Sequence, residues 1–389
     1  MPALTALPHQ LKDHLKRLSP ALLRWVGLKF LSKTQTEALL RPYQIAQFSE
    51  PSVRLEAVTD VVDPGKLLFE QKVIETDPDF VWNYANVNSR AELLPSGNLN
   101  IGHTFLDTDF GNQALLADLF NPDRRLVERA PVAIALWSHY WGGYYDFMFF
   151  VAAKLARIKT VMSPAHFAEA AVSYPLMNTA FEGELLQLLG VGPDRLFDTR
   201  QYSVHFDQCI LANNSSWFYP AAADVLALKT MIEARMPPPD VAPNRRLYIS
   251  RQGRRRVVNE EALTGMLRQH GFEIIEDVPR SVVDQIELYR SASFVVGPHG
   301  ASFANLLWCR PGTQLLELFA PNYQPEYFRY LTQVLGLQYA AYCFGPPANS
   351  HHTFVDSDME VSVDEVEQGV VSLLAARGDF GIPEKPKPV

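Results

Sequence analysis

Regular alternation between short apolar runs and amphipathic stretches in the second half of the chain constrains its fold more than any other feature. The expected elements of this region are strands at 246–250, 272–276, 294–296, 314–319 and 338–342, and helices at 260–270, 283–292, 301–307 and 326–335. Strands that are joined through helices pair in parallel, and helices then cover both faces of the sheet. About 100 residues of this pattern match the size of one Rossmann-like domain.

The first half of the chain predicts a second sheet of the same kind. Its expected elements are a strand at 131–137, a helix at 144–158, a strand at 160–162, a helix at 177–189 and a strand at 195–197. Residues 50–130 contain short segments and turn sequences, which predict strands and loops with one helix near 113–120. The predicted fold class is therefore α/β, with two Rossmann-like parallel-sheet domains facing across a cleft.

A proline-rich linker divides the two regions, because Pro237, Pro238 and Pro239 cannot continue a preceding helix. The expected organisation is a basic amphipathic helical segment at 1–45, a first Rossmann-like domain at 46–236, the linker at 237–244, a second Rossmann-like domain at 245–350, and a tail with one helix at 351–389. The basic stretch at 11–33 either lies on an anionic membrane surface or packs as a surface helix on its own domain.

The composition excludes several classes of protein. With 47% hydrophobic residues in a chain of 389, wholesale disorder is excluded. The formal net charge of -8 argues against binding nucleic acid through bulk charge, so any anion site must be local. Three widely spaced cysteines predict neither a disulfide framework nor a structural zinc site. Because the sequence also lacks a secretory signal and an apolar run of membrane-spanning length, we expect a cytoplasmic protein.

The turn Gly297-Pro298-His299-Gly300-Ala301 follows an apolar strand and opens a helix. Gly300 allows a ligand to approach the backbone closely. We expect the amides of Ala301, Ser302 and Phe303 to point from the positive helix end toward an anion. The alternative is a tight structural turn in which a backbone carbonyl satisfies His299.

A cationic loop follows the first strand of the same domain. It contains Arg251, Arg254, Arg255 and Arg256 around one glycine. Guanidinium groups suit the paired oxygens of a diphosphate, whereas a charge run in solvent is the alternative. Because the carboxyl ends of parallel strands share one edge of a sheet, this loop and the turn at His299 together predict a nucleotide diphosphate site.

Glu317 is an acid inside the apolar strand at 314–319. A buried carboxylate is costly unless it is paired. We therefore expect Glu317 to accept hydrogen bonds from ribose hydroxyls or to hold an arginine, with pairing inside the protein as the alternative. Tyr323 and Tyr327 follow soon after and are candidates for the same rim.

The segment 137–146 of the first domain combines aromatic residues, two glycines, His139 and Asp146. Aromatic platforms with a few polar groups bind sugar rings, and either His139 or Asp146 could take a proton from an attacking hydroxyl. Aromatic packing in a core is the alternative.

The sequence gives little support for a metal site. Asp107 and Asp109 flank Thr108 and could place a divalent ion on a diphosphate, whereas His351 and His352 lack a third ligand at metal spacing. We expect no metal ion.

Taken together, these motifs resemble glycosyltransferase family 61, the DUF563-like family of bacterial capsular and surface-polysaccharide type. The resemblance covers most of residues 130–345 and rests on Arg246–Arg251, Arg254-Arg255, Asn259-Glu260, Gly297–Ala301, Asn305 and Leu316-Glu317-Leu318. It implies a GT-B-like pair of Rossmann domains and inverting transfer of a sugar from a nucleoside diphosphate. It also implies that Arg251 and Arg255 bind the diphosphate and that the loop at His299 binds the donor.

One departure from the family concerns the catalytic base. The family's first domain usually carries Tyr-Tyr-His with an acid about four residues later, whereas here Tyr144-Tyr145 is followed by Asp146, and Phe150 takes the acid's place. Either Asp146 or His139 is then the base. Loss of the acid also leaves an alternative function, a catalytically inactive sugar-nucleotide-binding scaffold of a glycan assembly complex.

The sequence therefore predicts an inverting, metal-independent glycosyltransferase in which the first domain presents the acceptor. The donor is a nucleoside-diphosphate sugar, with UDP as first choice, and the acceptor is a hydroxyl of a glycan or glycolipid in surface-polysaccharide or capsule synthesis, with peripheral contact to the inner membrane face. The expected site residues are Arg251, Arg254, Arg255, Gly297, His299, Gly300, Ala301, Ser302, Asn305 and Glu317 for the donor, Trp141, Tyr144 and Tyr145 for the acceptor, and Asp146 and His139 for catalysis. A dinucleotide oxidoreductase is less favoured, because no GxGxxG follows an early strand.

Overall fold

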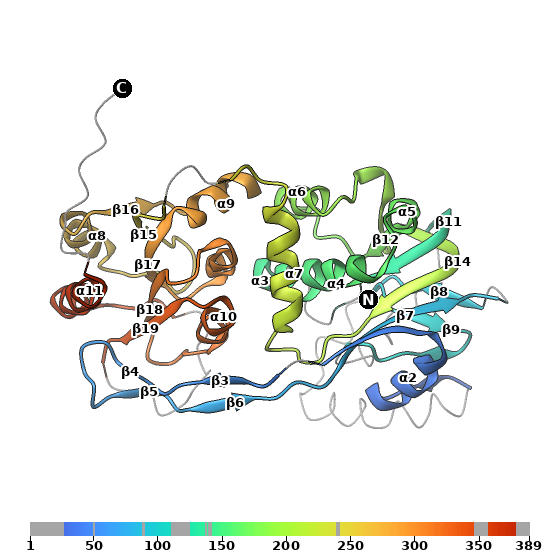
Figure 1. Cartoon of the computed structure of the whole chain (residues 1–389), viewed down its shortest axis with the longest axis horizontal. Helices are drawn as coiled ribbons and strands as arrows, with labels where there is room; N and C mark the ends of the chain where they lie inside the picture. Colours follow the sequence, from blue (N-terminus) through green and yellow to red (C-terminus); the bar gives the residue numbers. More distant parts are fainter. Residues whose placement is uncertain are drawn as a thin grey trace, which may run out of the picture. The chain divides into compact units, whose positions relative to one another are not determined.

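A computed structural model of the chain divides it into two compact units (Figure 1). The structure describes residues 27–49, 51–87, 90–109, 125–136, 138, 142–238, 242–345 and 357–378. The first unit comprises Met1–Glu50 and Thr76–Arg235, and the second comprises Pro51–Glu75 and Met236–Val389. The helix predicted near 113–120, His139, Trp141 and most of the basic segment at 11–33 lie outside the described residues.

The second unit contains a five-stranded parallel sheet in the order β16-β15-β17-β18-β19. Its strands are β15 (Arg245–Ile249), β16 (Phe272–Ile275), β17 (Ala292–Pro298), β18 (Gln314–Phe319) and β19 (Gln338–Cys343). The chain places β16 on one side of β15 and β17 on the other, so the order in which strands are added reverses between β15 and β17. These strands lie where the alternation of the sequence predicts them, because burial on both faces makes each strand a nearly continuous apolar run.

Helices cover both faces of this sheet (Figure 1). They are α8 (Glu260–Gln269), α9 (Val282–Arg290), the 3₁₀ helix η5 (Ala301–Trp308), α10 (Tyr327–Leu335) and α11 (Val363–Arg377). The sequence places α11 in a separate tail at 351–389. The structure instead makes it part of the core, because Val366 and Val370 pack with Leu263 and Leu267 of α8.

Residues 51–75 form an inserted segment of the second unit, although the sequence places them in the first domain at 46–236. The segment contains two antiparallel pairs, β3 (Val53–Leu55) with β6 (Lys72–Ile74) and β4 (Val58–Thr59) with β5 (Leu67–Phe69). Phe69 packs on Phe319, and Arg329 of α10 donates at 2.7 Å to the carbonyls of both Glu56 and Glu70. Strands this short carry no signal in the sequence for so distant a partner.

The first unit contains a mixed six-stranded sheet in the order β13-β12-β11-β14-β7-β2. Its strands are β2 (Gln44–Phe48), β7 (Asp79–Ala85), β11 (Leu126–Ala135), β12 (Ala171–Tyr174), β13 (Leu196–Asp198) and β14 (Tyr202–Ala212). The four strands from β13 to β14 are parallel, whereas β7 and β2 are antiparallel to their neighbours. The expectation of a wholly parallel sheet is therefore wrong here, because two short strands from residues 44–85 extend the sheet on one side.

A smaller sheet and the helices complete the first unit. The sheet has the order β1-β10-β9-β8, with β1 (Lys29–Phe30), β8 (Ala91–Leu93), β9 (Leu99–Ile101) and β10 (Thr104–Phe105). The helices are α2 (Lys33–Leu40), η1 (Arg41–Tyr43), α3 (Tyr144–Asp146), the π-helical η3 (Phe147–Ala152), α4 (Ala153–Val161), α5 (Pro164–Glu169), α6 (Ala180–Leu188), η4 (Pro193–Arg195) and α7 (Ala222–Glu233).

The strand predicted at 160–162 is wrong. Residues Tyr144 to Val161 form one continuous helical run through α3, η3 and α4, and the next strand is β12. Burial of every side chain from Phe147 to Ile158 fixes this helix against the sheet, so tertiary packing overrides the β-preference of Val161.

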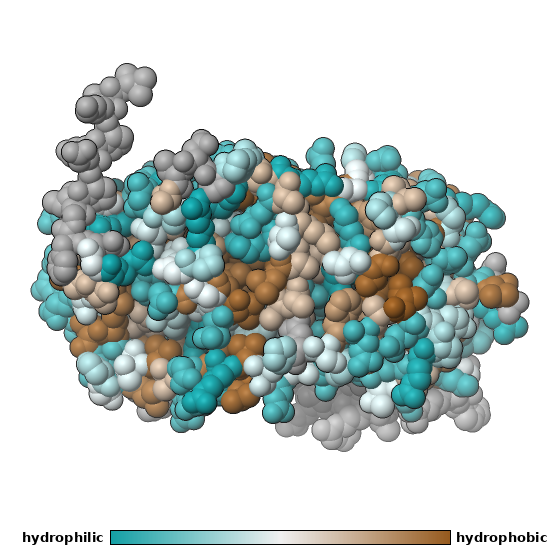
Figure 2. Space-filling model, viewed as in Figure 1, coloured by the Kyte–Doolittle hydropathy of each residue, from teal (hydrophilic) through white to brown (hydrophobic). Residues whose placement is uncertain are grey.

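The surface shown in Figure 2 mixes hydrophilic and hydrophobic side chains. Among the described helices, none combines the length and the apolar character that crossing a bilayer requires.

Candidate functional site

Two loops meet at the carboxyl edge of the second unit's sheet, where the strand order reverses between β15 and β17. Ligands of open α/β sheets bind at such a switch point. The cationic loop follows β15 and the turn at His299 follows β17, and Arg251 Nη1 donates to the His299 carbonyl oxygen at 3.3 Å. The structure therefore brings together the two segments that the sequence singles out.

Gly300 provides the space that Arg251 occupies. A Cβ atom added at Gly300 would lie 1.6 Å from Arg251 Nη1, so no other residue fits without moving the guanidinium. Arg251 Nε also donates to the Arg254 carbonyl oxygen at 2.5 Å. Burial, followed by the neighbouring charge of Arg255, lowers the pKa of Arg251 to about 10. The Arg251 cation is thus fixed in place where its charge is poorly solvated.

Arg255 is the most buried arginine of the cationic loop, with 8% of its surface exposed. Its backbone is left-handed, with a φ of 61°, which is uncommon for a residue other than glycine. Its guanidinium lies 5.0 Å from the Tyr323 ring centroid, and its buried Nε has no hydrogen-bond partner in the structure.

Neither Arg251 nor Arg255 forms an ion pair with a carboxylate of the described residues, whereas Arg256 pairs with Asp358 at 2.9 Å. Arg254 is exposed. Buried charges are costly unless they are paired. Arg251 and Arg255 therefore form a site that an anionic ligand with several oxygens would neutralise.

His299 is held by Glu317 rather than by a backbone carbonyl. Its Nδ1 lies 2.6 Å from Glu317 Oε1, and the Tyr339 hydroxyl donates to Glu317 Oε2 at 2.7 Å. Both oxygens of Glu317 are thus used inside the protein. The structure thus shows the pairing inside the protein that the sequence left open as the alternative to a ribose or an arginine.

Burial favours the neutral form of the His299 imidazole, and aromatic side chains pack around the ring. Burial lowers the pKa of His299, against the raising effect of Glu317, and the charges of Arg255 and Arg251 lower it further. The ring is stacked on Phe319 and Tyr327, with centroid separations of 5.5 and 6.2 Å. A neutral ring that donates from Nδ1 to Glu317 has Nε2 as its hydrogen-bond acceptor.

Some backbone and side-chain groups of the helix that follows the turn form hydrogen bonds inside the protein. The Phe303 amide donates to the Gly300 carbonyl at 3.0 Å, so it is not directed at an anion as the sequence predicts. Asn305 is 3% exposed, donates from Nδ2 to Gln285 Oε1 at 2.8 Å, and accepts from Trp308 Nε1 at 3.2 Å. Asn305 therefore supports the turn, as does Gly297, where a Cβ would approach the Ile249 carbonyl oxygen to 2.8 Å. Ala301 and Ser302 remain partly exposed beside Gly300.

In the first unit, Asp146 lies in the first turn of the helix that begins at Tyr144. Burial raises the pKa of Asp146, which makes this carboxylate a better proton acceptor. Tyr145 is 8% exposed and packs on Phe149 and Phe150, so it belongs to the core, and the Tyr144 ring lies edge-on to Phe181.

Asp109 is used in a buried ion pair. It lies 3.6 Å from Lys154 Nζ and accepts a hydrogen bond from Asn214 Nδ2 at 2.7 Å. Asp107 is fixed through its backbone amide, which donates to Thr36 Oγ1 at 2.8 Å. Within the described ranges, no three His, Cys, Asp or Glu side chains gather closely enough to hold a metal ion.

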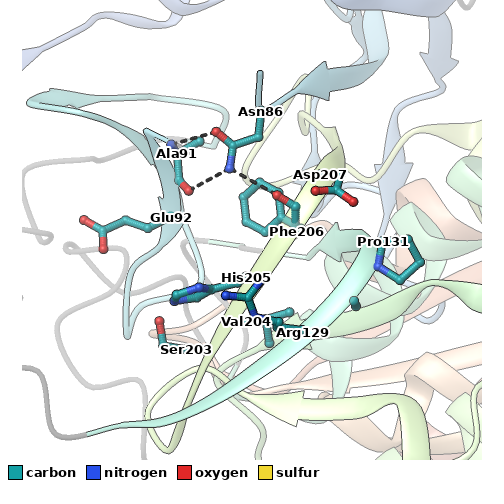
Figure 3. A pocket seen from close by; sticks show the side chains of 11 residues that line it. Asn86, Ala91, Glu92, Arg129, Pro131, Ser203, Val204, His205, Phe206 and Asp207 are labelled. Carbon is teal, nitrogen blue, oxygen red and sulfur yellow. Dashed lines mark hydrogen bonds between the residues drawn. The ribbon is translucent and has the colours of Figure 1, made fainter. Parts of the chain in front are cut away.

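A separate pocket of about 520 Å³ lies in the first unit, beside the amino-terminal halves of β11 and β14 (Figure 3). Charged side chains of both signs line it, including Glu92, Arg129 and Asp207, and Asn86 joins the adjoining strands through hydrogen bonds to Ala91 and Phe206. None of the residues singled out by the sequence lines this pocket.

The sequence did not indicate Tyr339 as a partner of Glu317, because the two residues are far apart in the chain and nothing near Tyr339 marks the hydrogen bond between them. The run Trp217-Phe218-Tyr219 follows an apolar strand and is an aromatic signal that the sequence interpretation did not use.

Comparison with known proteins identifies the family. A family model described as Glycosyltransferase 61 matches residues 9–316, which is most of the chain. The chain belongs to glycosyltransferase family 61. The resemblance drawn from the motifs is thereby confirmed, and the family match includes both the cationic loop and the turn at His299.

This family-61 chain is also similar to the xylan glycosyltransferase MUCI21 of Arabidopsis thaliana, with 29% identity over 121 residues. The aligned part is 30% of this chain and 24% of the plant protein, so the match spans about a quarter of that relative's length.

Proposed function

We propose that this chain is an inverting glycosyltransferase that moves a sugar from a nucleoside-diphosphate sugar to a hydroxyl of a glycan or glycolipid. UDP is the first choice of nucleotide. The observation that carries the proposal is the pair Arg251 and Arg255, two poorly solvated cations that form no ion pair with a described carboxylate, at the switch point of a Rossmann-like sheet. Membership of family 61 and the glycosyltransferase relative support it.

The second unit would hold the donor. The guanidinium groups of Arg251 and Arg255 would donate to the diphosphate oxygens and stabilise the negative charge that develops as the diphosphate leaves. Gly300 keeps Arg251 within reach of this anion, and His299, oriented by Glu317, would accept a hydrogen bond at Nε2 from a hydroxyl of the nucleotide sugar. Glu317 would act only through His299.

The first unit would present the acceptor. The acceptor oxygen attacks the anomeric carbon opposite the diphosphate, the bond from that carbon to the diphosphate oxygen breaks, and the acceptor proton passes to a carboxylate. A single displacement inverts the configuration. Asp146 is the proposed base because burial raises its pKa. The GT-B-like arrangement of two units, which would bring Asp146 to the donor, is part of this proposal.

Two arginine variants and a matched control test the donor site. Arg251→Ala and Arg255→Ala should each reduce UDP release from a reactive UDP-sugar by about 10²–10³-fold, the usual cost of removing one such charge-stabilising donor. Arg256→Ala removes an arginine of the same loop that is already paired with Asp358, and it should stay within about threefold of wild type. Equal turnover in all three variants would contradict the proposal.

A scaffold without turnover is the second candidate function. It is favoured by Phe150, a buried phenylalanine where the family's acid is expected. A scaffold would bind the UDP-sugar in calorimetry and release no UDP in the presence of glycan acceptors, whereas an enzyme releases UDP. Turnover that persists in a chelator would support the proposed independence of metal.

We further propose that the reaction serves surface-polysaccharide synthesis at the inner face of a membrane. A flotation assay with anionic liposomes should recover less of a chain that lacks residues 1–33 than of the full chain. Equal flotation would remove membrane contact from the proposal.

A further inference from the structure

The loop between β14 and α7, residues 213–221, lies at the carboxyl edge of the first unit's sheet. β14 is parallel to β11, and Leu211 pairs with Ala135 near the end of both strands. The segment that leads to Asp146 leaves the sheet at this same edge, where open α/β sheets bind their ligands. The loop and the proposed base thus follow neighbouring parallel strands.

Trp217 exposes half of its surface on this loop. Within the described part of the first unit, it is the most exposed tryptophan, tyrosine or phenylalanine. Its ring lies 5.6 Å from Phe218, edge to face, and Phe218 lies 4.7 Å from Tyr219. Exposing a large aromatic ring forgoes the free energy of burying it. At the carboxyl edge of an open α/β sheet, where ligands bind, such a ring is a candidate for contact with a ligand.

The loop holds Trp217 in a fixed place, because each polar residue before it is hydrogen-bonded. Asn213 Oδ1 accepts from the Phe80 amide at 2.6 Å, and Asn214 Nδ2 donates to Asp109 at 2.7 Å. Ser215 Oγ donates to Asp79 Oδ2 at 3.2 Å. Ser216 Oγ accepts from the amides of Phe218 and Tyr219 at 3.2 and 3.1 Å.

A buried group of five charges supports these anchors. Arg157 lies 2.9 Å from Asp79 and 3.5 Å from Asp224, and Lys154 lies 3.6 Å from Asp109. Arg157 also donates to the Asn213 carbonyl oxygen. The contacts of Arg157 with the Asn213 carbonyl, of Asp109 with Asn214 and of Asp79 with Ser215 join this buried group to the loop that carries Trp217.

We propose that Trp217 is a stacking platform for a sugar ring of the glycan acceptor. The apolar face of a pyranose ring packs on an aromatic side chain while its hydroxyls bind polar groups around it, and a rigid ring loses little entropy when it binds. The inference rests on the proposed function, because it assigns the acceptor class to the unit that would supply the base.

The test compares four full-length proteins: wild type, Trp217→Ala, Trp217→Phe and, as a matched control, Leu226→Ala. Leu226 is an apolar residue of α7 in the same unit with 44% exposure. Each protein is applied to an immobilised panel of neutral oligosaccharides, including xylo-oligosaccharides, and its UDP affinity is measured by calorimetry. Melting temperatures show whether each variant is folded.

We expect Trp217→Ala to weaken glycan binding by about tenfold or more, while Trp217→Phe retains binding within about threefold because it keeps an aromatic face. Leu226→Ala should bind as wild type does, and all four proteins should have equal UDP affinity. Unchanged glycan binding in Trp217→Ala, or no glycan binding by wild type, would overturn the inference. A change of oligomeric state in Trp217→Ala would assign the ring to a second copy of the chain instead.

Failure of the proposed function has a different signature. A wild-type chain that binds no UDP contradicts the donor site, whatever its affinity for glycans. Loss of glycan binding in Trp217→Ala with intact UDP binding would support the acceptor site alone.

Discussion

A pair of buried or partly buried cations in one unit can be compared with a pair in the other, and the two pairs are treated differently. In the first unit, Lys154 and Arg157 lie within ion-pair distance of three aspartates. In the second unit, Arg251 and Arg255 have no such partner among the described carboxylates. The difference teaches that a buried cation indicates a ligand only when the protein leaves its charge unbalanced.

The causes that shift the pKa differ in the same way for one cation of each pair, Lys154 and Arg251. Burial lowers the pKa of Lys154 to about 8, and the next contribution, from Asp109, opposes that effect. Burial lowers the pKa of Arg251 to about 10, and the next contribution, from Arg255, adds to it. A neighbouring carboxylate stabilises the first cation, whereas a second cation destabilises the other. An anion bound at Arg251 would instead stabilise this cation and raise the pKa of Arg251.

The largest effect is expected from a substitution that removes one of the paired cations of the first unit. Arg157→Met should lower the free energy of unfolding by about 3–5 kcal/mol, because it leaves Asp79 and Asp224 buried without their cation. Urea unfolding measures this change. Arg251→Met is the control and should change stability by less than about 1 kcal/mol, since no carboxylate loses a partner. Similar losses in both variants would contradict the distinction.

A smaller effect is expected from Gly300→Ala. The added Cβ would displace the Arg251 guanidinium, so UDP affinity should fall by about tenfold, or about 1.4 kcal/mol. Gly253→Ala, in the same cationic loop, places its Cβ in open space and should bind UDP nearly as wild type does. Unchanged affinity in Gly300→Ala, measured by calorimetry, would show that the position of Arg251 does not matter for binding.

The smallest effect concerns pH. Because the pKa of Lys154 is about 8 in the folded chain and 10.5 in its ordinary state, the unfolded chain holds more protons between these values. Stability from this group therefore rises as pH increases from 8 to 10.5. The stability of wild type relative to Lys154→Met should increase across this window by on the order of 1 kcal/mol. Urea unfolding at a series of pH values measures this stability difference. A decrease in the difference across the window would mean that Lys154 keeps its proton through its pairing with Asp109.

The sheet of the second unit could be predicted from the sequence because each strand is buried on both faces and each connection is short. The cationic loop and the turn at His299 could be placed on one edge for the same reason, since position in a parallel sheet follows from chain order. The hydrogen-bond partners of a polar residue inside a strand were harder to predict from the sequence. The sequence left open whether Glu317 contacts a ligand or pairs inside the protein, because its partner Tyr339 lies on the adjacent strand and 22 residues away.

The first unit was predicted less well because its decisive contacts join distant residues. Asp79, Lys154 and Asp224 come from three separate parts of the chain, and none of them indicates the others. The strand expected at 160–162 follows local preference, whereas burial of the preceding helix decides the structure. The aromatic run at Trp217 was visible, but only its place at the end of β14 gives it meaning.

The inserted segment at 51–75 has a consequence for exchanging parts between relatives. Because both of its ends continue into the first unit, the polypeptide passes from one unit to the other three times rather than once. A chimera joined only at the proline-rich linker would leave Phe319 without Phe69, and Arg329 without the carbonyls of Glu56 and Glu70. Recombination that transplants the second unit must therefore carry two stretches of coding sequence, not one.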